Sequence, residues 1–186
     1  MFAPNYFIVK PVDGRRYNNI RNYGGVEFII STSQEDHTVS NRFAEVVSLP
    51  RYYVGDVNVG DIIIVHHNVF KFYYDMKGNQ KSSWHHLFDD YFILEEAQLY
   101  LYKTSDDKWT APFPYCFVRP IKSEEKVINT LGKHEELWGE LVFKNGNMSN
   151  VSEGDIVSFT PDSEYEFNID GEILYRMYDR NICLKR

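Results

Sequence analysis

The sequence contains little cysteine and no long hydrophobic run. Its 186 residues include only two cysteines, Cys116 and Cys183. Both lie in apolar segments, so we expect a reduced, buried pair rather than a disulfide. No apolar run reaches the roughly 18–20 residues of a membrane-spanning helix, and the N-terminus lacks the basic-then-apolar order of a signal peptide. We therefore expect a cytoplasmic protein with no membrane partner.

Positive charge and catalytic motifs are also scarce. The net charge of −7 argues against nucleic acid as the main partner, because neutralising phosphates needs a surplus of Lys and Arg. A local basic patch remains compatible with this charge. No Gly-x-Gly-x-x-Gly unit, phosphate-binding loop, Ser/His/Asp arrangement or Cys-x-x-Cys is present. We therefore expect no enzyme and no cofactor.

Two histidine pairs, His66-His67 and His85-His86, raise the question of a metal site, because imidazole is the commonest nitrogen ligand of metals. Neighbouring residues of a strand point to opposite faces, so His66 and His67 should not turn to one ion. We expect no metal site, and predict that these histidines are solvated, hydrogen-bonded or placed at a subunit interface.

The chain is rich in residues that favour strands. Aromatic residues make up 16% of it, with 14 Tyr and 13 Phe, and such residues are enriched in β-sheets. Short apolar runs are separated by Gly, Pro, Asn and Asp, and Asp170-Gly171 is a typical two-residue hairpin turn. We expect strands at 6–10, 43–49, 61–65, 70–74, 91–94, 99–103, 115–121, 139–143, 155–160, 165–169, 172–175 and 182–185.

Four segments of the first half recur in the second half in the same order. Residues 6–11, 43–47, 59–63 and 98–103 return as 115–120, 138–142, 153–157 and 181–185. The spacing between copies falls from 109 residues at the first segment to 95, 94 and finally 83 at the last. The first copy therefore contains two extra stretches, which we place in loops because loops tolerate added length.

The repeat predicts two domains, at 1–103 and 115–186, with a linker at 104–114. The linker contains Pro112 and Pro114, which restrict the backbone and end the preceding strand. Many short antiparallel strands in each copy favour a small barrel or sandwich.

Each copy resembles the GroES-like co-chaperonin (chaperonin-10) family. The resemblance rests on an ordered set: an opening apolar strand, a long loop at 12–42, a strand containing Glu45, and the turn Gly60-Asp61 before another strand. The second copy repeats the set with Glu140 and Gly154-Asp155. The resemblance covers most of the chain and implies an all-β protein of two tandem GroES-like small β-barrel domains.

In that family, a mobile loop with a Gly-Gly pair and apolar residues docks on the ATP-bound chaperonin. By resemblance, the chaperonin-docking residues here are Gly24, Gly25, Val26, Phe28, Ile29 and Ile30. A loop that orders on binding attaches weakly, and several copies in an oligomer multiply the attachment. The alternative is that 26–30 forms an edge strand packed on the core.

The second copy lacks a Gly-Gly pair in its corresponding loop, 121–137, which we expect to be a plain surface loop. The excursion that forms the roof of the family's ring is short in both copies, at 49–58 and 144–150. The resemblance implies a homo-oligomeric lid with an open centre in the cytoplasm, or in the host cytoplasm if the protein comes from a phage. The alternative function is a viral structural or assembly protein that reuses the barrel without a chaperonin.

Overall fold

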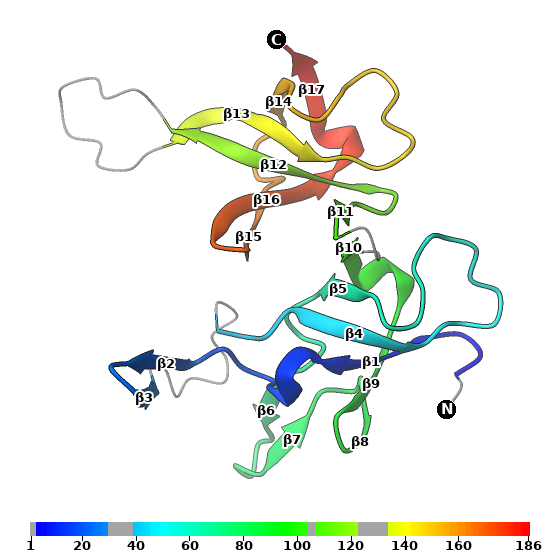
Figure 1. The fold of residues 1–186 in the computed structure, drawn as a ribbon, viewed down its shortest axis with the longest axis vertical. Helices are drawn as coiled ribbons and strands as arrows, with labels where there is room; N and C mark the ends of the chain where they lie inside the picture. Colours follow the sequence, from blue (N-terminus) through cyan, green and yellow to red (C-terminus); the bar gives the residue numbers. More distant parts are fainter. Residues whose placement is uncertain (1–2, 30–38, 104–106, 123–133) are drawn as a thin grey trace. The chain divides into compact units, whose positions relative to one another are not determined.

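The strands of this chain form two sheets that follow each other along the sequence. The computed structural model describes residues 3–29, 39–103, 107–122 and 134–186. Regular structure among these residues consists of β-strands and three short 3-10 turns, so the predicted all-β class is confirmed. None of their helical turns has the length and apolar character needed to cross a membrane. The chain divides into unit 1, Met1–Lys108, and unit 2, Trp109–Arg186 (Figure 1).

Unit 1 holds six strands of one sheet, in the order β10-β5-β4-β1-β9-β8, and two separate two-stranded sheets, β2-β3 and β6-β7. Its elements are β1 (Phe7–Pro11), η1 (Val12–Gly14), β2 (Ile20–Tyr23), β3 (Val26–Ile29), β4 (Phe43–Ser48), β5 (Ile62–Val65), β6 (Phe72–Tyr74), β7 (Gln80–Ser82), β8 (His86–Phe88), β9 (Tyr91–Leu94), η2 (Glu96–Gln98) and β10 (Leu99–Lys103).

Unit 2 begins with β11 (Trp109–Thr110) and has one six-stranded sheet in the order β15-β16-β12-β13-β14-β17. Its remaining elements are β12 (Tyr115–Lys122), β13 (His134–Phe143), β14 (Ile156–Phe159), β15 (Tyr165–Ile169), β16 (Glu172–Tyr178), η3 (Asp179–Asn181) and β17 (Ile182–Lys185).

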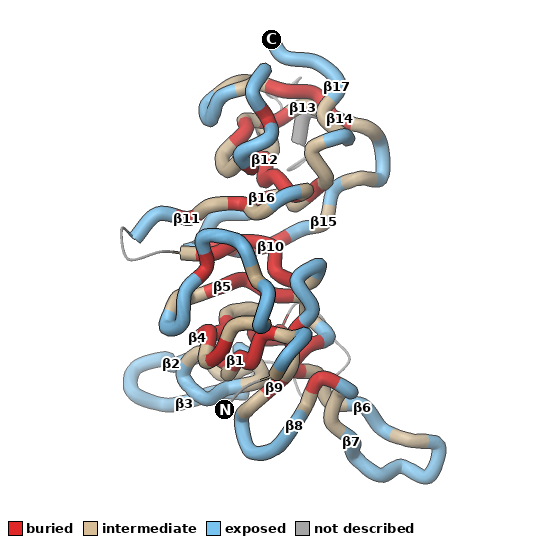
Figure 2. The backbone as a smooth tube through the Cα atoms, turned by 90° about the vertical axis from the view of Figure 1, so that its right-hand side faces the viewer, coloured by how far each residue is buried: buried red, intermediate tan, exposed pale blue. Residues whose placement is uncertain are grey.

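Each unit has its own apolar core (Figure 2). Along its strands, buried residues alternate with less buried ones, because successive side chains point to opposite faces of the sheet. The pattern is clearest in β4, where Ala44, Val46 and Ser48 are buried and their neighbours are half-buried. The core of unit 1 also includes Phe70 and Phe92. The core of unit 2 includes Cys116, Val118, Leu141, Met148, Val157, Phe159 and Met177.

The two sheets share their backbone pairing. In unit 1, Val9 lies opposite Val46; in unit 2, the equivalent residue Val118 lies opposite Leu141, and the register shifts just before this position in both. The pairings of β4 with β5, β1 with β9 and β5 with β10 also recur between the equivalent strands of unit 2. The internal repeat of the sequence is therefore also a repeat of strand order and register.

The Gly-Asp turns before β5 and β14 have the same geometry. Gly60 has φ +95° and Gly154 has φ +92°, a region in which a side chain would be strained. The carboxylate of Asp61 accepts a hydrogen bond at 2.8 Å from the backbone N–H three residues earlier, and Asp155 does the same at 2.6 Å. Glycine and aspartate therefore recur here because the turn requires a positive φ and a local acceptor.

The predicted small barrels are not closed among the described strands. In unit 1, β8 and β10 do not pair with each other, and in unit 2 β15 and β17 do not pair. The end strand β8 is short and its register with β9 shifts, so it supplies few regular hydrogen bonds. No strand lies in 49–61 or 144–155, all of which are described.

Several strand predictions need correction. The predicted strand at 70–74 begins only at Phe72 and pairs with β7 in a separate hairpin. The strand of unit 1 that occupies the place of β15 is β8, which the sequence did not predict. In unit 2, β12 and β13 extend into the predicted surface loop, since Lys122 pairs with His134. Cys183 is free but exposed, because it lies on β17 at the end of the sheet, whereas Cys116 is free and buried.

Candidate docking site

The predicted docking segment forms a β-hairpin. Strands β2 and β3 pair from Ile20 opposite Ile29 to Tyr23 opposite Val26. Gly24 and Gly25 form the turn with φ +61° and +87°, the two positive angles that a type I′ turn requires. The side-chain oxygen of Asn22 accepts a hydrogen bond from the N–H of Gly25 at 2.9 Å. The Gly-Gly pair therefore shapes a tight turn, where the resemblance implied a mobile loop.

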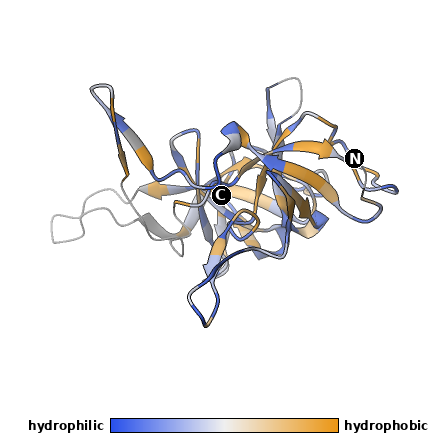
Figure 3. Ribbon diagram, turned by 90° about the horizontal axis from the view of Figure 1, so that it is seen from below, coloured by the Kyte–Doolittle hydropathy of each residue, from blue (hydrophilic) through white to orange (hydrophobic). Residues whose placement is uncertain are grey.

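The hairpin exposes most of its apolar side chains. Tyr23, Val26, Phe28 and Ile29 are each between 51% and 65% exposed. By strand alternation, Tyr23, Val26 and Phe28 share one face, where the rings of Tyr23 and Phe28 meet edge to face at 6.0 Å. In Figure 3 this hairpin lies at the upper left, and parts of both its strands have the orange colour of hydrophobic residues. Large apolar surface exposed in this way is typical of binding sites.

The alternative prediction, an edge strand packed on the core, is half correct. Val26–Ile29 is a strand, but among the described strands it pairs only with β2, and all four of its residues are exposed. Ile30, the last predicted docking residue, lies outside the described residues. An isolated two-stranded hairpin is at best marginally stable in water. Among the described residues, β2-β3 is a separate sheet with exposed apolar side chains.

The base of the hairpin segment is closed on unit 1 by backbone and side-chain hydrogen bonds. The amide of Asn18 donates to the carbonyl of Val39 at 2.7 Å, and the amide of Asn41 donates to the carbonyl of Arg16 at 3.0 Å. The buried side chain of Asn41 also donates to the carbonyl of Arg15 at 2.6 Å. These bonds hold together the two ends of the segment that connects β1 to β4.

Arg16 connects this base to the second of the two extra stretches of unit 1, the second insertion, which contains β6 and β7. Its guanidinium donates from Nε to the carbonyl of Phe70 at 2.7 Å and from Nη1 to the hydroxyl of Ser82 at 3.2 Å. The guanidinium carbon lies 3.6 Å from the ring centre of Phe72 and 4.8 Å from that of Phe92, positions that favour cation–π attraction. Burial lowers the pKa of Arg16 from its usual value, while Tyr17 and Asp90 oppose this effect.

Tyr17 makes a second connection at the same place. Its hydroxyl accepts a hydrogen bond from the amide of Phe72 at 2.7 Å, and the two rings stack with centres 6.1 Å apart. Burial raises the pKa of the Tyr17 hydroxyl, and the bond from Phe72 opposes the rise. Arg16 and Tyr17 form what we call the Arg16–Tyr17 clamp, which fixes the base of β2-β3 to the base of β6-β7.

The sequence did not single out Arg16 or Tyr17, because the residues that they contact lie more than 50 positions away along the chain. Their only local signal was their position at the start of the first insertion.

The histidines contribute no metal site among the described residues. The rings of His66 and His67 lie 4.2 Å apart and nearly parallel, so the prediction that they point apart is wrong, since they follow the end of β5. His85 is buried, with Nε2 at 3.0 Å from the side-chain oxygen of Gln98, and His86 contacts the carbonyl of Asp89 at 2.9 Å. No group of three or more His, Cys, Asp or Glu in the described ranges is placed to hold a metal ion.

Comparison with protein families and with curated proteins found no match. The function must therefore be argued from the exposed hairpin, its anchorage and the repeat.

Proposed function

We propose that this protein is a divergent tandem co-chaperonin, with two GroES-like domains, that docks on an ATP-bound chaperonin through the β2-β3 hairpin and assists protein folding as a lid. The single observation that carries the proposal is the exposed apolar hairpin between β1 and β4. That is the place at which the resemblance puts the docking loop. The hairpin presents Tyr23, Val26, Phe28 and Ile29 to solvent, although the strands before and after it, β1 and β4, belong to a well-packed sheet.

The energetics favour a reversible contact repeated in an oligomer. Fully burying one apolar side chain contributes about 1.5–3 kcal/mol, and part of that gain is lost in ordering the hairpin. One hairpin would therefore bind weakly. A homo-oligomer that presents several hairpins together would bind more tightly through effective concentration, and we propose such an assembly.

The test is retention of the full chain on an immobilised, purified bacterial chaperonin, with and without ATP. Wild-type protein should be retained only with ATP. The double variant Phe28→Ser/Ile29→Ser should bind at least roughly tenfold more weakly, because it removes the apolar anchors. Its thermal midpoint should stay close to that of the wild type, since both side chains are more than half exposed.

The matched control is Tyr52→Ser/Val54→Ser, which removes an aromatic and an aliphatic side chain that are at least as exposed but lie outside the hairpin. It should bind like the wild type. Light scattering should give a mass of several chains. A strict monomer that is not retained with or without ATP would overturn the proposal and favour the viral structural alternative.

A further inference from the structure

We propose that the β6-β7 hairpin is a second docking element, which binds an acidic patch containing apolar side chains on the same partner that β2-β3 contacts. This inference rests on the proposed function. It goes beyond it by assigning a site and a partner chemistry to the second insertion of unit 1.

The β6-β7 hairpin is an addition to the repeated sheet. In unit 1, residues 66–85 connect β5 to β8 and include both strands of the hairpin, whereas in unit 2 the equivalent connection is only 160–164. The core of unit 2 is complete without such a hairpin. The sheet therefore does not need β6-β7 in order to fold, and its residues are available for another role.

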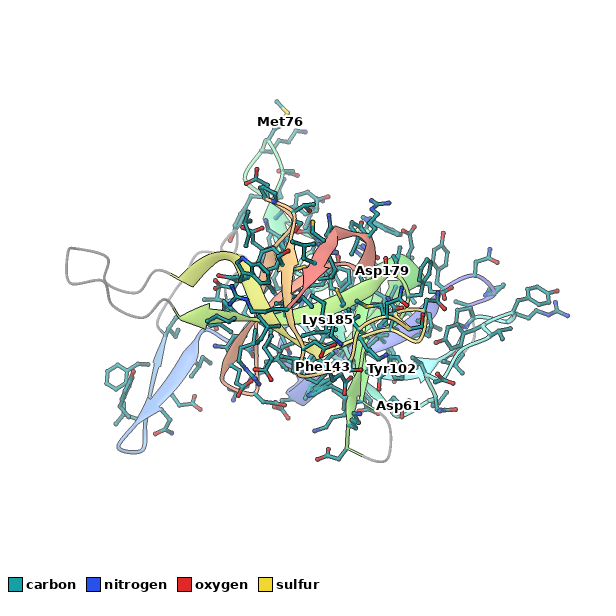
Figure 4. All side chains as sticks on the ribbon, turned by 90° about the horizontal axis from the view of Figure 1, so that it is seen from above. Asp61, Met76, Tyr102, Phe143, Asp179 and Lys185 are labelled. Carbon is teal, nitrogen blue, oxygen red and sulfur yellow. The ribbon has the colours of Figure 1, made fainter. Side chains whose placement is uncertain are left out.

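The outer half of the hairpin exposes apolar and aromatic groups to solvent. Tyr73 and Tyr74 are about half exposed, and Met76 is fully exposed. Met76 extends outward from the tip of the hairpin, away from Asp61 and Tyr102 of the same unit (Figure 4). Tyrosine and methionine are enriched at protein interfaces, because they supply large contact areas with few polar atoms.

The side-chain carboxylate of Asp75 holds the turn at the tip of the β6-β7 hairpin. The Oδ1 of Asp75 accepts hydrogen bonds from the backbone amides of Lys77 and Asn79, each at 2.9 Å, and its Oδ2 accepts one from the Asn79 side chain at 3.2 Å. These bonds lower the pKa of Asp75, with the contribution of Asn79 the largest. A preorganised tip loses little conformational entropy on binding.

The charge of the hairpin indicates an acidic partner surface. Lys77 and Lys81 are exposed and form no ion pair with another described residue, and Lys81 lies directly opposite Tyr73. The carboxylate of Asp75 is occupied by the turn. A positive, aromatic hairpin on a chain of net charge −7 is complementary to an acidic patch, and such complementarity fixes the orientation of a complex.

The Arg16–Tyr17 clamp links the two hairpins to one base. Arg16 contacts both Phe70, which precedes β6, and Ser82, the last residue of β7, and its own carbonyl closes the base of the β2-β3 segment. Two weak contacts held at a fixed separation reinforce each other when they reach the same partner. The linkage therefore favours one partner for both hairpins over two separate partners.

The experiment measures binding to the purified bacterial chaperonin with ATP at low and moderate salt. Tyr73→Ser/Met76→Ser should bind roughly tenfold more weakly than the wild type, whereas the matched control Tyr52→Ser/Val54→Ser should be unchanged. Lys81→Glu should weaken binding severalfold and reduce its salt dependence. Its control is Arg51→Glu, which makes the same charge change at another exposed residue.

The outcomes separate this inference from the proposed function. If Phe28→Ser/Ile29→Ser loses binding while Tyr73→Ser/Met76→Ser and Lys81→Glu bind like the wild type, the proposed function stands and the second docking element is wrong. If the wild type does not bind at all, both fail. If Arg51→Glu weakens binding as much as Lys81→Glu, the effect is one of net charge and the assignment to the hairpin fails.

Discussion

The two units have the same sheet and differ in what is added to it. Both order six strands in the same way, and the registers match at every pairing except that of β8 with β9. In each sheet an ion pair joins the first two strands in chain order, Lys10 to Glu45 and Arg119 to Glu140. Unit 1 adds the two exposed hairpins and the Arg16–Tyr17 clamp. The comparison indicates that the sheet is a scaffold whose pairing is constrained, whereas the insertions are free to change without disturbing it. We therefore look for function in the added parts.

The largest expected effect tests how similar the two scaffolds are. Unit 1 has Ala44 where unit 2 has Gly139, each opposite a proline of the first strand. A Cβ on Gly139 would clash with the side chain of Val118 and lie 2.7 Å from the carbonyl oxygen of Arg119. We expect Gly139→Ala to destabilise unit 2 by about 2–3 kcal/mol through overpacking, as measured by urea unfolding.

The reverse change supplies the control for that prediction. Ala44→Gly should cost unit 1 about 1 kcal/mol, from the lost methyl group and the greater freedom of glycine in the unfolded chain. Hydrogen exchange should place each loss in the unit that carries the change. A Gly139→Ala protein as stable as the wild type would show that the two sheets are more alike at this position than their backbone contacts indicate.

The sequence predicted the scaffold better than the insertions, for a physical reason. The bounds of β9, β10, β15 and β17 match the predicted segments, because apolar composition and adjacent turn residues are local signals. The strands β7 and β8 were missed because Gln80–Ser82 and His86–Phe88 have little apolar pattern and are held by pairing with β6 and β9.

The candidate site was predicted in part. The residues of β3 were identified from the Gly-Gly pair and the apolar run, but the resemblance suggested a mobile loop where a regular hairpin exists. The role of Arg16 could not be read from the sequence, because its partners are brought to it only by the folded sheet. Likewise, the exposure of Cys183 depends on the position of β17 at the end of the sheet.

The second prediction breaks the connection that distinguishes unit 1. Arg16→Met keeps the aliphatic part of the side chain and removes the guanidinium. It therefore loses the hydrogen bonds to Phe70 and Ser82 and the cation–π contact with Phe72. We expect a loss of about 1–2 kcal/mol in unit 1. Amide hydrogen exchange in β6 and β7 should become faster, while exchange in unit 2 stays unchanged.

The neighbouring residue provides the matched control. Arg15 is exposed and its nearest acidic partner, Glu27, is 4.0 Å away, so Arg15→Met should change stability by less than about 0.5 kcal/mol. If Arg15→Met loosened β6-β7 as much as Arg16→Met, the clamp would have no special role in holding the second hairpin.

The smallest expected effect is a difference in pH response between the units. Burial lowers the pKa of His85 in the folded state, while its bond with Gln98 and the nearby Glu95 oppose the shift. Because the unfolded chain then binds a proton more readily than the folded chain, unit 1 should lose stability as the pH falls below about 6.5. The residue of unit 2 equivalent to His85 is Tyr165, because His86 pairs with β9 as Glu166 pairs with β16. Unit 2 therefore has no histidine at this place. Stability measured between about pH 7.5 and 5.5 should therefore fall more in unit 1, and His85→Phe should reduce this pH dependence even if it changes the stability at neutral pH. An unchanged slope in His85→Phe would assign the acid sensitivity of unit 1 to another group.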